Sequence, residues 1–173
     1  NGWNMEKGPF NKLRPARQPG WSVLAQSVDL HDDGMAELMR QFRFVSDARL
    51  DDVMISVATK GGGVGPHFDS YDVFLLQGHG TRRWRISQQT DLELIPDLPC
   101  KILQRFEAEQ EYLLEPGDML YLPPHVAHDG IAETDDCMTI SIGFRAPSHG
   151  ALAYGMLHAV SDQLMANLGN DDG

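Results

Sequence analysis

The sequence predicts a mainly β fold, an antiparallel sandwich or barrel with short helices at its flanks. Two observations predict it. From residue 51 onward, six short segments are rich in β-forming residues, and Gly, Pro or Asp residues separate them. Helical spacing of apolar residues occurs only before and after this region. The predicted strands are 53–58, 72–77, 82–87, 111–114, 119–122 and 138–144.

The flanking segments predict an irregular arm, one further strand and two helices. Residues 1–20 contain three prolines and little periodicity, and residues 21–28 alternate as a strand does. Residues 34–44 and 151–167 carry apolar side chains at helical spacing, and the stripe of the first helix is expected to pack into the core. We expect an N-terminal arm, strand and short helix packed on the barrel, then the barrel core, then the start of a truncated C-terminal helical region. These parts span 1–50, 51–147 and 148–173.

Composition limits the classes of function. The chain has 25 acidic and 14 basic residues and a formal net charge of −11, which argues against direct nucleic-acid binding because such surfaces need a basic stripe. No apolar run approaches the roughly 20 residues that cross a bilayer, so we expect no membrane association. Cys100 and Cys137 form no metal-binding or redox motif. Two isolated thiols favour a reducing, cytoplasmic location.

Two separated motifs indicate a metal site. His67 and Asp69 are two residues apart, so on extended chain the imidazole and the carboxylate face the same side. Residues 115–124 predict a tight turn, a short strand and a prolyl corner that delivers a histidine to the end of a strand. Two imidazoles and one carboxylate on one face leave three positions open on an octahedral metal, as in non-haem Fe(II) oxygenases.

The choice of the third ligand lies between His125 and His128. These histidines are three residues apart, so on extended chain they would point to opposite sides. Their distances from Gly117 and from the two prolines favour His128. His125 is then expected at the rim of the pocket, and the remaining histidines are expected at the surface or in local hydrogen bonds.

These motifs and their surroundings resemble one family closely. Residues 61–74, 77–78, 82–85, 114–124 and 141–147 are similar to the bacterial JmjC-type ribosomal oxygenases of the cupin superfamily, in particular to the arginine hydroxylases of the sixteenth large-subunit ribosomal protein. The resemblance covers most of residues 8–155. It implies a double-stranded β-helix, or jelly roll, and a metal held by His67, Asp69 and His128.

The resemblance also implies the activity. The cofactors would be Fe(II), 2-oxoglutarate and O2, the reaction the hydroxylation of an arginine β-carbon in a ribosomal protein, and the full-length protein a homodimer. Two positions depart from the family pattern: His125 stands where a small residue is expected, and Thr139 where Asn is expected. The shape of the pocket rim and the contact at position 139 are therefore open.

The co-substrate site is predicted from alternation in one strand. In residues 82–87, Arg82 shares a face with Trp84 and Ile86, and this face is the apolar, inward one. A buried guanidinium needs a counter-ion, and the far carboxylate of 2-oxoglutarate suits it. The alternative is a structural ion pair with a buried acid. Ser56 and Thr139, on other predicted strands, are candidate hydroxyl donors to the co-substrate.

Candidate substrate contacts are Tyr71, Asp72 and Asp129, expected near the mouth of the pocket. Hydroxylation at the metal requires no general base, so none is assigned among the residues. The alternatives are a histidine hydroxylase or a lysyl demethylase on the same fold, or a metal-binding cupin that is not an oxygenase. An inward arginine beside the metal site favours the oxygenases.

Overall fold

The computed structural model describes residues 5–10 and 19–168, so most of the predicted N-terminal arm lies outside the described residues. Within them the chain forms eight strands, two α-helices and two short 3-10 helices. The strands are β1 (Ser22–Ala25), β2 (Leu50–Ala58), β3 (Val73–His79), β4 (Arg82–Ser87), β5 (Gln110–Leu114), β6 (Met119–Leu122), β7 (Ala127–Ala132) and β8 (Cys137–Phe144). The helices are η1 (Val28–Leu30), α1 (Asp33–Arg40), η2 (Asp47–Arg49) and α2 (His149–Leu168).

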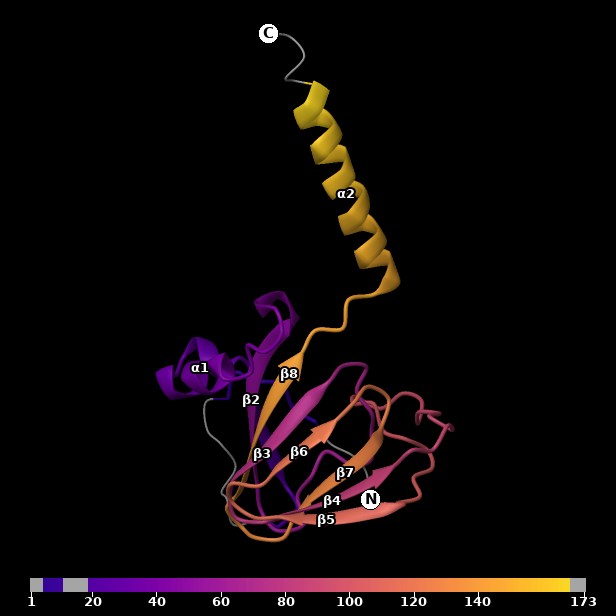
Figure 1. Ribbon diagram of the computed structural model, residues 1–173. Coiled ribbons are helices and arrows are strands. Elements are labelled where there is room, and N and C mark those ends of the chain that lie inside the picture. Colours follow the sequence, from indigo (N-terminus) through magenta and orange to yellow (C-terminus); the bar gives the residue numbers. More distant parts are fainter. Residues whose placement is uncertain (1–4, 11–18, 169–173) are drawn as a thin grey trace.

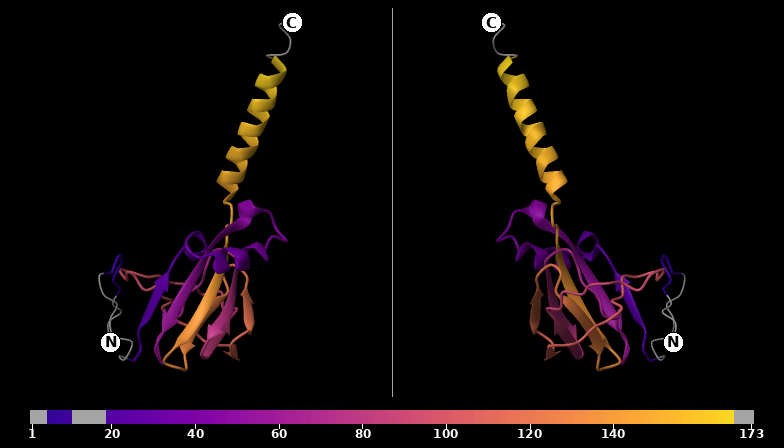
Figure 2. Two further views of the ribbon diagram at one scale, coloured as in Figure 1. Left: turned by 90° about the vertical axis from the view of Figure 1, so that its left-hand side faces the viewer. Right: turned by 90° about the vertical axis from the view of Figure 1, so that its right-hand side faces the viewer.

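The strands form two antiparallel sheets that pack against each other (Figures 1 and 2). The larger sheet has the order β1-β2-β8-β3-β6 and the smaller sheet the order β5-β4-β7. Chain neighbours such as β7 and β8 lie in different sheets, which is the connectivity of a jelly roll. The predicted mainly β, double-stranded β-helix fold is confirmed, and β4 and β6 have the predicted bounds.

The two faces of the large sheet have different chemistry. Val53 pairs with Ile142 across β2 and β8, and both side chains are fully buried on the outer face, towards α1. Ser56 pairs with Thr139 in the same register, and their side chains face the interior between the sheets. Because side chains alternate along a strand, one register produces both an apolar core and a polar cavity wall.

Helix α1 covers the outer face. The carboxylate of Asp32 caps the helix by accepting a hydrogen bond from the amide of Met35 at 2.9 Å. Met35, Leu38 and Met39 pack against the core, as predicted. The helix ends at Arg40 rather than at residue 44, because the chain turns there and places Phe42 in the buried cluster.

The small sheet confirms the alternation predicted for β4. Arg82, Trp84 and Ile86 are buried on the inner side. Arg83 and Arg85 face outward, where Arg83 pairs with Glu111 of β5 and with Glu133 after β7. The inner side of β4 is therefore a wall of the interior cavity.

Strand β7 was not among the predicted strands. Between the alanines at its two ends, Ala127–Ala132 contains a histidine, an aspartate, a glycine and a single β-branched residue, Ile131, so no apolar alternation marks it as a strand. Pairing with β4 over six residues creates the strand through tertiary contacts. This omission affects the site, because β7 carries His128.

Helix α2 extends away from the two sheets (Figures 1 and 2). The apolar stripe predicted for this helix is exposed over its described length, with Leu152 51% and Met156 71% accessible. No helix in the described part of the chain combines the length and apolar character needed to span a bilayer. The division into an arm, a core and a C-terminal helical region stays a prediction.

Candidate metal centre

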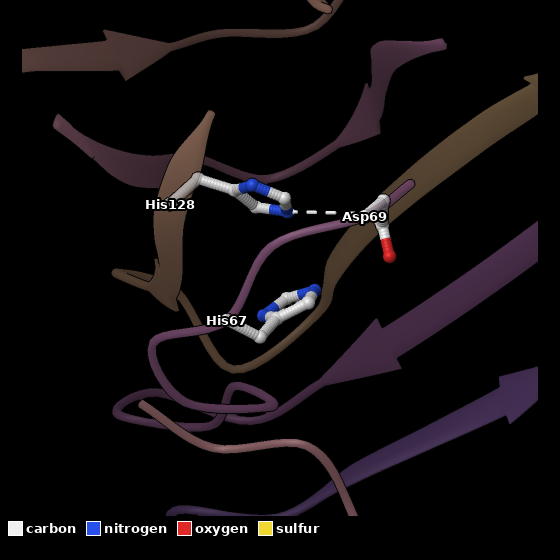
Figure 3. A group of neighbouring side chains, drawn as sticks. All are labelled: His67, Asp69 and His128. Atoms are coloured by element: carbon white, nitrogen blue, oxygen red, sulfur yellow. Dashed lines mark ion pairs between the residues drawn. The ribbon is translucent and has the colours of Figure 1, made fainter. Parts of the chain in front are cut away.

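The three predicted ligands meet at one end of the cavity between the sheets. His67 and Asp69 come from the segment between β2 and β3, and His128 is the second residue of β7. One ligand atom from each residue lies within 4.8 Å of the others, and His128 Nε2 is 3.7 Å from Asp69 Oδ2. Both imidazole rings are turned towards the carboxylate (Figure 3). This is a donor set of two nitrogens and one oxygen, which suits a divalent transition metal.

Backbone hydrogen bonds hold the three ligand residues together. The amide of His67 donates to the carbonyl of His128 at 2.9 Å, and the amide of His128 donates back to that of His67 at 2.8 Å. The amide of His125 donates to the carbonyl of Asp69 at 2.7 Å. The prolyl corner therefore fixes the Asp69 loop, and the fold preorganises the cluster without a metal.

Each imidazole is oriented by a second hydrogen bond. His67 Nδ1 lies 2.8 Å from the carbonyl of Gly65, and His128 Nδ1 lies 2.9 Å from the carbonyl of Val126. A carbonyl oxygen only accepts, so each Nδ1 carries a proton and each Nε2 keeps its lone pair for a cation.

Burial keeps His128 neutral. Desolvation, together with the nearby His67, lowers the pKa of His128 from 6.5 to about 4. At neutral pH the ring is therefore unprotonated, the form that binds a metal.

His125 lies outside this cluster. Its side chain is exposed and packs against Phe68 with ring centroids 5.8 Å apart. Its backbone has φ 66°, in the left-handed region, where glycine is favoured. That conformation explains why a small residue is expected at this position.

The cluster opens into a cavity of about 500 Å³ between the two sheets. Its walls come from β1, β2, β3, β4, β7 and β8 and from the segments before β2 and β3. The predicted residues that line it are Ser56, His67, Asp69, Tyr71, Arg82, His128 and Thr139. The cavity is large enough for a small dicarboxylate and an inserted side chain.

Arg82 is the most unusual residue of the cavity. Only 4% of it is exposed, and Nη1 donates to the carbonyl of Gly130 at 3.1 Å, whereas Nε and Nη2 have no hydrogen-bond partner. Burial lowers the pKa of Arg82. No carboxylate among the described residues forms an ion pair with it, so the alternative of a structural ion pair finds no support. Buried N–H groups of this kind need an acceptor, and an anionic ligand would supply one.

The carbonyl that Arg82 contacts is held by close packing. A Cβ atom on Gly130 would lie 2.6 Å from the ring of Trp84, and a Cβ atom on Gly63 would lie 2.4 Å from the carbonyl oxygen of Gly130. Both positions therefore require glycine. Gly63 belongs to the glycine-rich run before His67, and this contact is one physical reason for that run.

Ser56 and Thr139 lie opposite each other in the cavity wall, as their register dictates. The hydroxyl of Thr139 donates to Oε1 of Gln77 at 3.0 Å, so its proton is already used. Gln77 was missed in the sequence. It could have been found from the alternation of β3, because Gln77 follows Val73 and Leu75 on the inward side of the strand, where the pattern predicts an apolar residue.

The three predicted substrate residues have different positions. Tyr71 lines the cavity, and burial together with the charge of Asp69 raises the pKa of Tyr71 to about 12. Asp72 does not line the cavity: it accepts a hydrogen bond from Tyr121 at 2.6 Å. Asp129 does not line it either, because it follows His128 on a strand and faces the opposite side, where it pairs with Arg85. Only Tyr71 is at the predicted place.

Acidic residues that were not predicted surround the cavity mouth. Asp29, Asp51 and Asp52 line it. Asp52 accepts a hydrogen bond from the amide of Ser27 at 2.8 Å, and Asp51 pairs with Arg145 at 3.0 Å. In the sequence, the available signal was the adjacent pair Asp51 and Asp52 at the start of β2. The mouth has an excess of negative charge, which attracts cations.

The jelly roll with a cluster of two histidines and one aspartate in its interior defines a metal-binding cupin-type domain. The family model of the JmjC domain matches residues 37–152, so the chain belongs to the JmjC domain family. The family resemblance drawn from the motifs is thereby confirmed.

The similar proteins include ribosomal oxygenases. Over 154 residues the chain is 43% identical to "Ribosomal protein uL16 3-hydroxylase" of Escherichia coli K12, an alignment that covers 88% of this chain and 41% of the relative. It is 41% identical over 158 residues to a "Probable ribosomal oxygenase" of Haemophilus influenzae, covering 89% and 39%. The chain thus spans about two fifths of the length of these relatives.

A solved structure is similar as well. The Escherichia coli ribosomal oxygenase YcfD in complex with cobalt and 2-oxoglutarate superposes with a TM-score of 0.74 at 40% identity, covering 94% of this chain and 42% of that chain. At this identity and coverage, the likeness extends from the fold to the sequence.

Proposed function

We propose that the chain contains the catalytic domain of an Fe(II)- and 2-oxoglutarate-dependent protein hydroxylase. One observation carries the proposal: the buried guanidinium of Arg82, with two N–H groups unpaired, lines the same cavity as His67, Asp69 and His128. An anion held by Arg82 would extend towards the metal ligands. Relatives that are oxygenases by name, and one solved with cobalt and 2-oxoglutarate, support it.

In this proposal His67, Asp69 and His128 hold the metal. Three protein ligands leave three positions of an octahedral ion for the co-substrate and O2. Cobalt in the similar structure stands in for Fe(II), because both are divalent ions of the same row with similar ligand preferences. The Nδ1 bonds to Gly65 and Val126 keep both Nε2 atoms aimed at the ion.

The co-substrate is proposed to bind through its far carboxylate to Arg82, with Ser56 as a hydroxyl donor. A guanidinium offers paired N–H groups that match a carboxylate. When bound, Fe(II), 2-oxoglutarate and O2 supply the oxidant for hydroxylation of a C–H bond, with succinate and CO2 as co-products. The residues of this chain position the reactants and shield them from water, with Trp84 closing the cavity beside Arg82.

The proposed substrate is an arginine of a large-subunit ribosomal protein, hydroxylated at its β-carbon. Asp51 and Asp52 give the cavity acidic groups that suit a guanidinium. Tyr71 lines the same cavity as a neutral phenol, and its hydroxyl oxygen can accept a hydrogen bond from a guanidinium. The name of the Escherichia coli relative indicates the ribosomal protein. Asp72 and Asp129 have no place in this proposal.

Cytoplasmic location and a homodimeric full-length protein belong to the same proposal. A substrate that is a ribosomal protein favours the cytoplasm. The exposed apolar side chains of α2, among them Leu152 and Met156, are compatible with burial in a dimer of the longer protein.

The first test is an anaerobic titration of the protein with Fe(II) and 2-oxoglutarate, followed by the visible metal-to-ligand charge-transfer band. We expect a band in the native protein and none in Asp69→Ala. Metal binding without a band would favour a cupin that is not an oxygenase. Mass spectrometry of candidate peptides then separates the activities: one added oxygen on arginine, one added oxygen on histidine, or loss of a methyl group from lysine.

A further inference from the structure

Gln77 is a fully buried amide beside the proposed co-substrate site. It follows Val73 and Leu75 on the inward side of β3, and none of its surface is exposed. It does not line the cavity itself. It contacts two features that do concern the cavity: Thr139 in the wall, and the turn that leads to Arg82.

The hydrogen bonds of Gln77 fix the orientation of its amide. Nε2 donates to the carbonyl of His79 at 2.7 Å and to the carbonyl of Gly80 at 3.1 Å, with Cys137 Sγ at 3.4 Å. If the amide were flipped, the side-chain oxygen of Gln77 would face the two carbonyl oxygens of His79 and Gly80. None of these three oxygens would then have a hydrogen-bond donor at this place. The nitrogen must therefore face the turn, and the oxygen must face Thr139.

This orientation decides the role of Thr139. Oε1 of Gln77 only accepts, so the hydroxyl of Thr139 must use its single proton in the 3.0 Å bond to Gln77. Towards the cavity Thr139 can then offer a lone pair and a methyl group but no proton. A dicarboxylate at neutral pH has only acceptors, so it gains no hydrogen bond from Thr139.

The same amide braces the turn that carries Arg82. His79 is the last residue of β3, Gly80 follows it in the turn to β4, and Arg82 is the first residue of β4. The guanidinium of Arg82 donates to the carbonyl of Gly130 and has no ion-pair partner among the described residues, so its direction also depends on where the backbone of β4 begins. Gln77 binds both carbonyls of the turn at that point.

On the basis of the proposed function, we infer that Gln77 is a positioning residue for the co-substrate site. By accepting the only proton of the Thr139 hydroxyl, it leaves Thr139 solely as a hydrogen-bond acceptor towards the cavity. By binding the carbonyls of His79 and Gly80, it stabilises the turn before Arg82. The donors left for a carboxylate are then Arg82 and Ser56, and the hydroxyl of Thr139 is not a direct contact, contrary to the role expected for it from sequence.

The test compares Gln77→Met with Thr139→Val and with a matched control, Gln89→Met. Gln89 also bridges two carbonyls through Nε2, those of Asp91 and Arg105, but lies in the outer segment away from the cavity. Two quantities are measured in the intact protein: the Kd for 2-oxoglutarate in the anaerobic Fe(II) form, and the position of the Arg82 Nε–H signal in the ¹H–¹⁵N spectrum of the metal-free form.

We expect Gln77→Met to shift the Arg82 signal and to raise the Kd about ten-fold, with Fe(II) affinity unchanged, because Arg82 loses its orientation. Thr139→Val should raise the Kd less than about two-fold, and Gln89→Met should change neither quantity. If Gln77→Met does not fold, Gln77→Leu replaces it, since it also fills the buried position, removes both donors without adding a charge and should cause the same two changes.

Two results would overturn the inference. An equally large loss of affinity in Thr139→Val would mean that its hydroxyl donates directly to the co-substrate. A native Arg82 signal and a native Kd in the folded Gln77 variant would reduce Gln77 to a core residue. A native protein that binds no 2-oxoglutarate would overturn the proposed function instead, and the Arg82 signal alone would then decide whether Gln77 braces the turn.

Discussion

Asp129 and Arg85 are register partners across β7 and β4, and their side chains form an ion pair on the face of the small sheet opposite His128. The Asp129 side chain is 4% exposed, and Arg85 also lies over the ring of Phe106, 5.6 Å from its centroid. The pair therefore fastens β7 to β4 and holds the segment before β5 against the sheet. The strand that carries His128 is therefore stabilised by an ion pair on its outer face, away from the cavity.

The pair predicts a stability effect without a binding effect. Asp129→Ala should lower the free energy of unfolding by about 2 kcal/mol, because it leaves Arg85 half-buried without its counter-ion. Glu111→Ala, which breaks an exposed pair with Arg83, should cost less than about 1 kcal/mol. Urea unfolding of both variants checks the difference. Native stability combined with weaker binding of substrate peptide would instead restore Asp129 to the site.

Asp69→Ala should separate metal binding from folding. Asp69 is a quarter exposed, and its backbone carbonyl, not its side chain, accepts the hydrogen bond from His125. Removal of the carboxylate should therefore change the stability of the metal-free protein by less than about 1 kcal/mol. Fe(II) affinity and turnover should be lost, because one of three ligands is missing from an open site. Calorimetry with and without Fe(II) checks this, and a variant that consumes 2-oxoglutarate at the native rate would exclude Asp69 as a ligand.

His125 and His128 should respond in opposite ways. His125→Gly relieves a left-handed backbone conformation and should raise stability by up to about 1 kcal/mol with turnover intact. His128→Ala should abolish turnover. Thermal unfolding and 2-oxoglutarate consumption check the two variants, with His125→Ala as a third. If His125→Ala were the more damaging to activity, the third ligand would be His125.

The sequence predicts more of this site than of its surroundings, and the reason is local. Arg82 could be placed because alternation within one short strand puts it on the same face as Trp84 and Ile86. Asp129 could not, because β7 has no apolar pattern and arises from pairing with β4; once β7 is known to be a strand, the residue after His128 must face away from it. The bonds that join Gln77 to Cys137 and to Thr139 span 60 and 62 positions of the chain, and no local pattern encodes them.

Arg82 is expected to lower the stability of the ligand-free protein and to strengthen the binding of 2-oxoglutarate. Its guanidinium is buried with two unpaired N–H groups, so Arg82→Met should stabilise the protein without ligands by about 1 kcal/mol. The same change should raise the 2-oxoglutarate requirement by about 100-fold or more, because the carboxylate loses a charged, paired contact. Arg83→Met, on the exposed face of the same strand, is the matched control and should leave the requirement unchanged. Urea unfolding and 2-oxoglutarate titration measure the two effects, and an unchanged requirement in Arg82→Met would assign Arg82 a structural role.

The stability of the metal-free protein should fall as the pH is lowered from 6.5 towards 4. In the folded state the pKa of His128 is lowered to about 4 by burial and by His67, whereas the ring titrates near 6.5 when unfolded. Between these values the unfolded chain binds more protons than the folded chain, so acidification favours unfolding. His128→Gln removes this ring and should flatten the pH dependence over the same interval. Thermal unfolding of both proteins at several pH values checks it, and equal slopes would mean that His128 is not buried as a neutral ring. Fe(II) should raise the stability without weakening this pH dependence, because a metal on Nε2 displaces the proton from the folded ring while the unfolded ring still binds it.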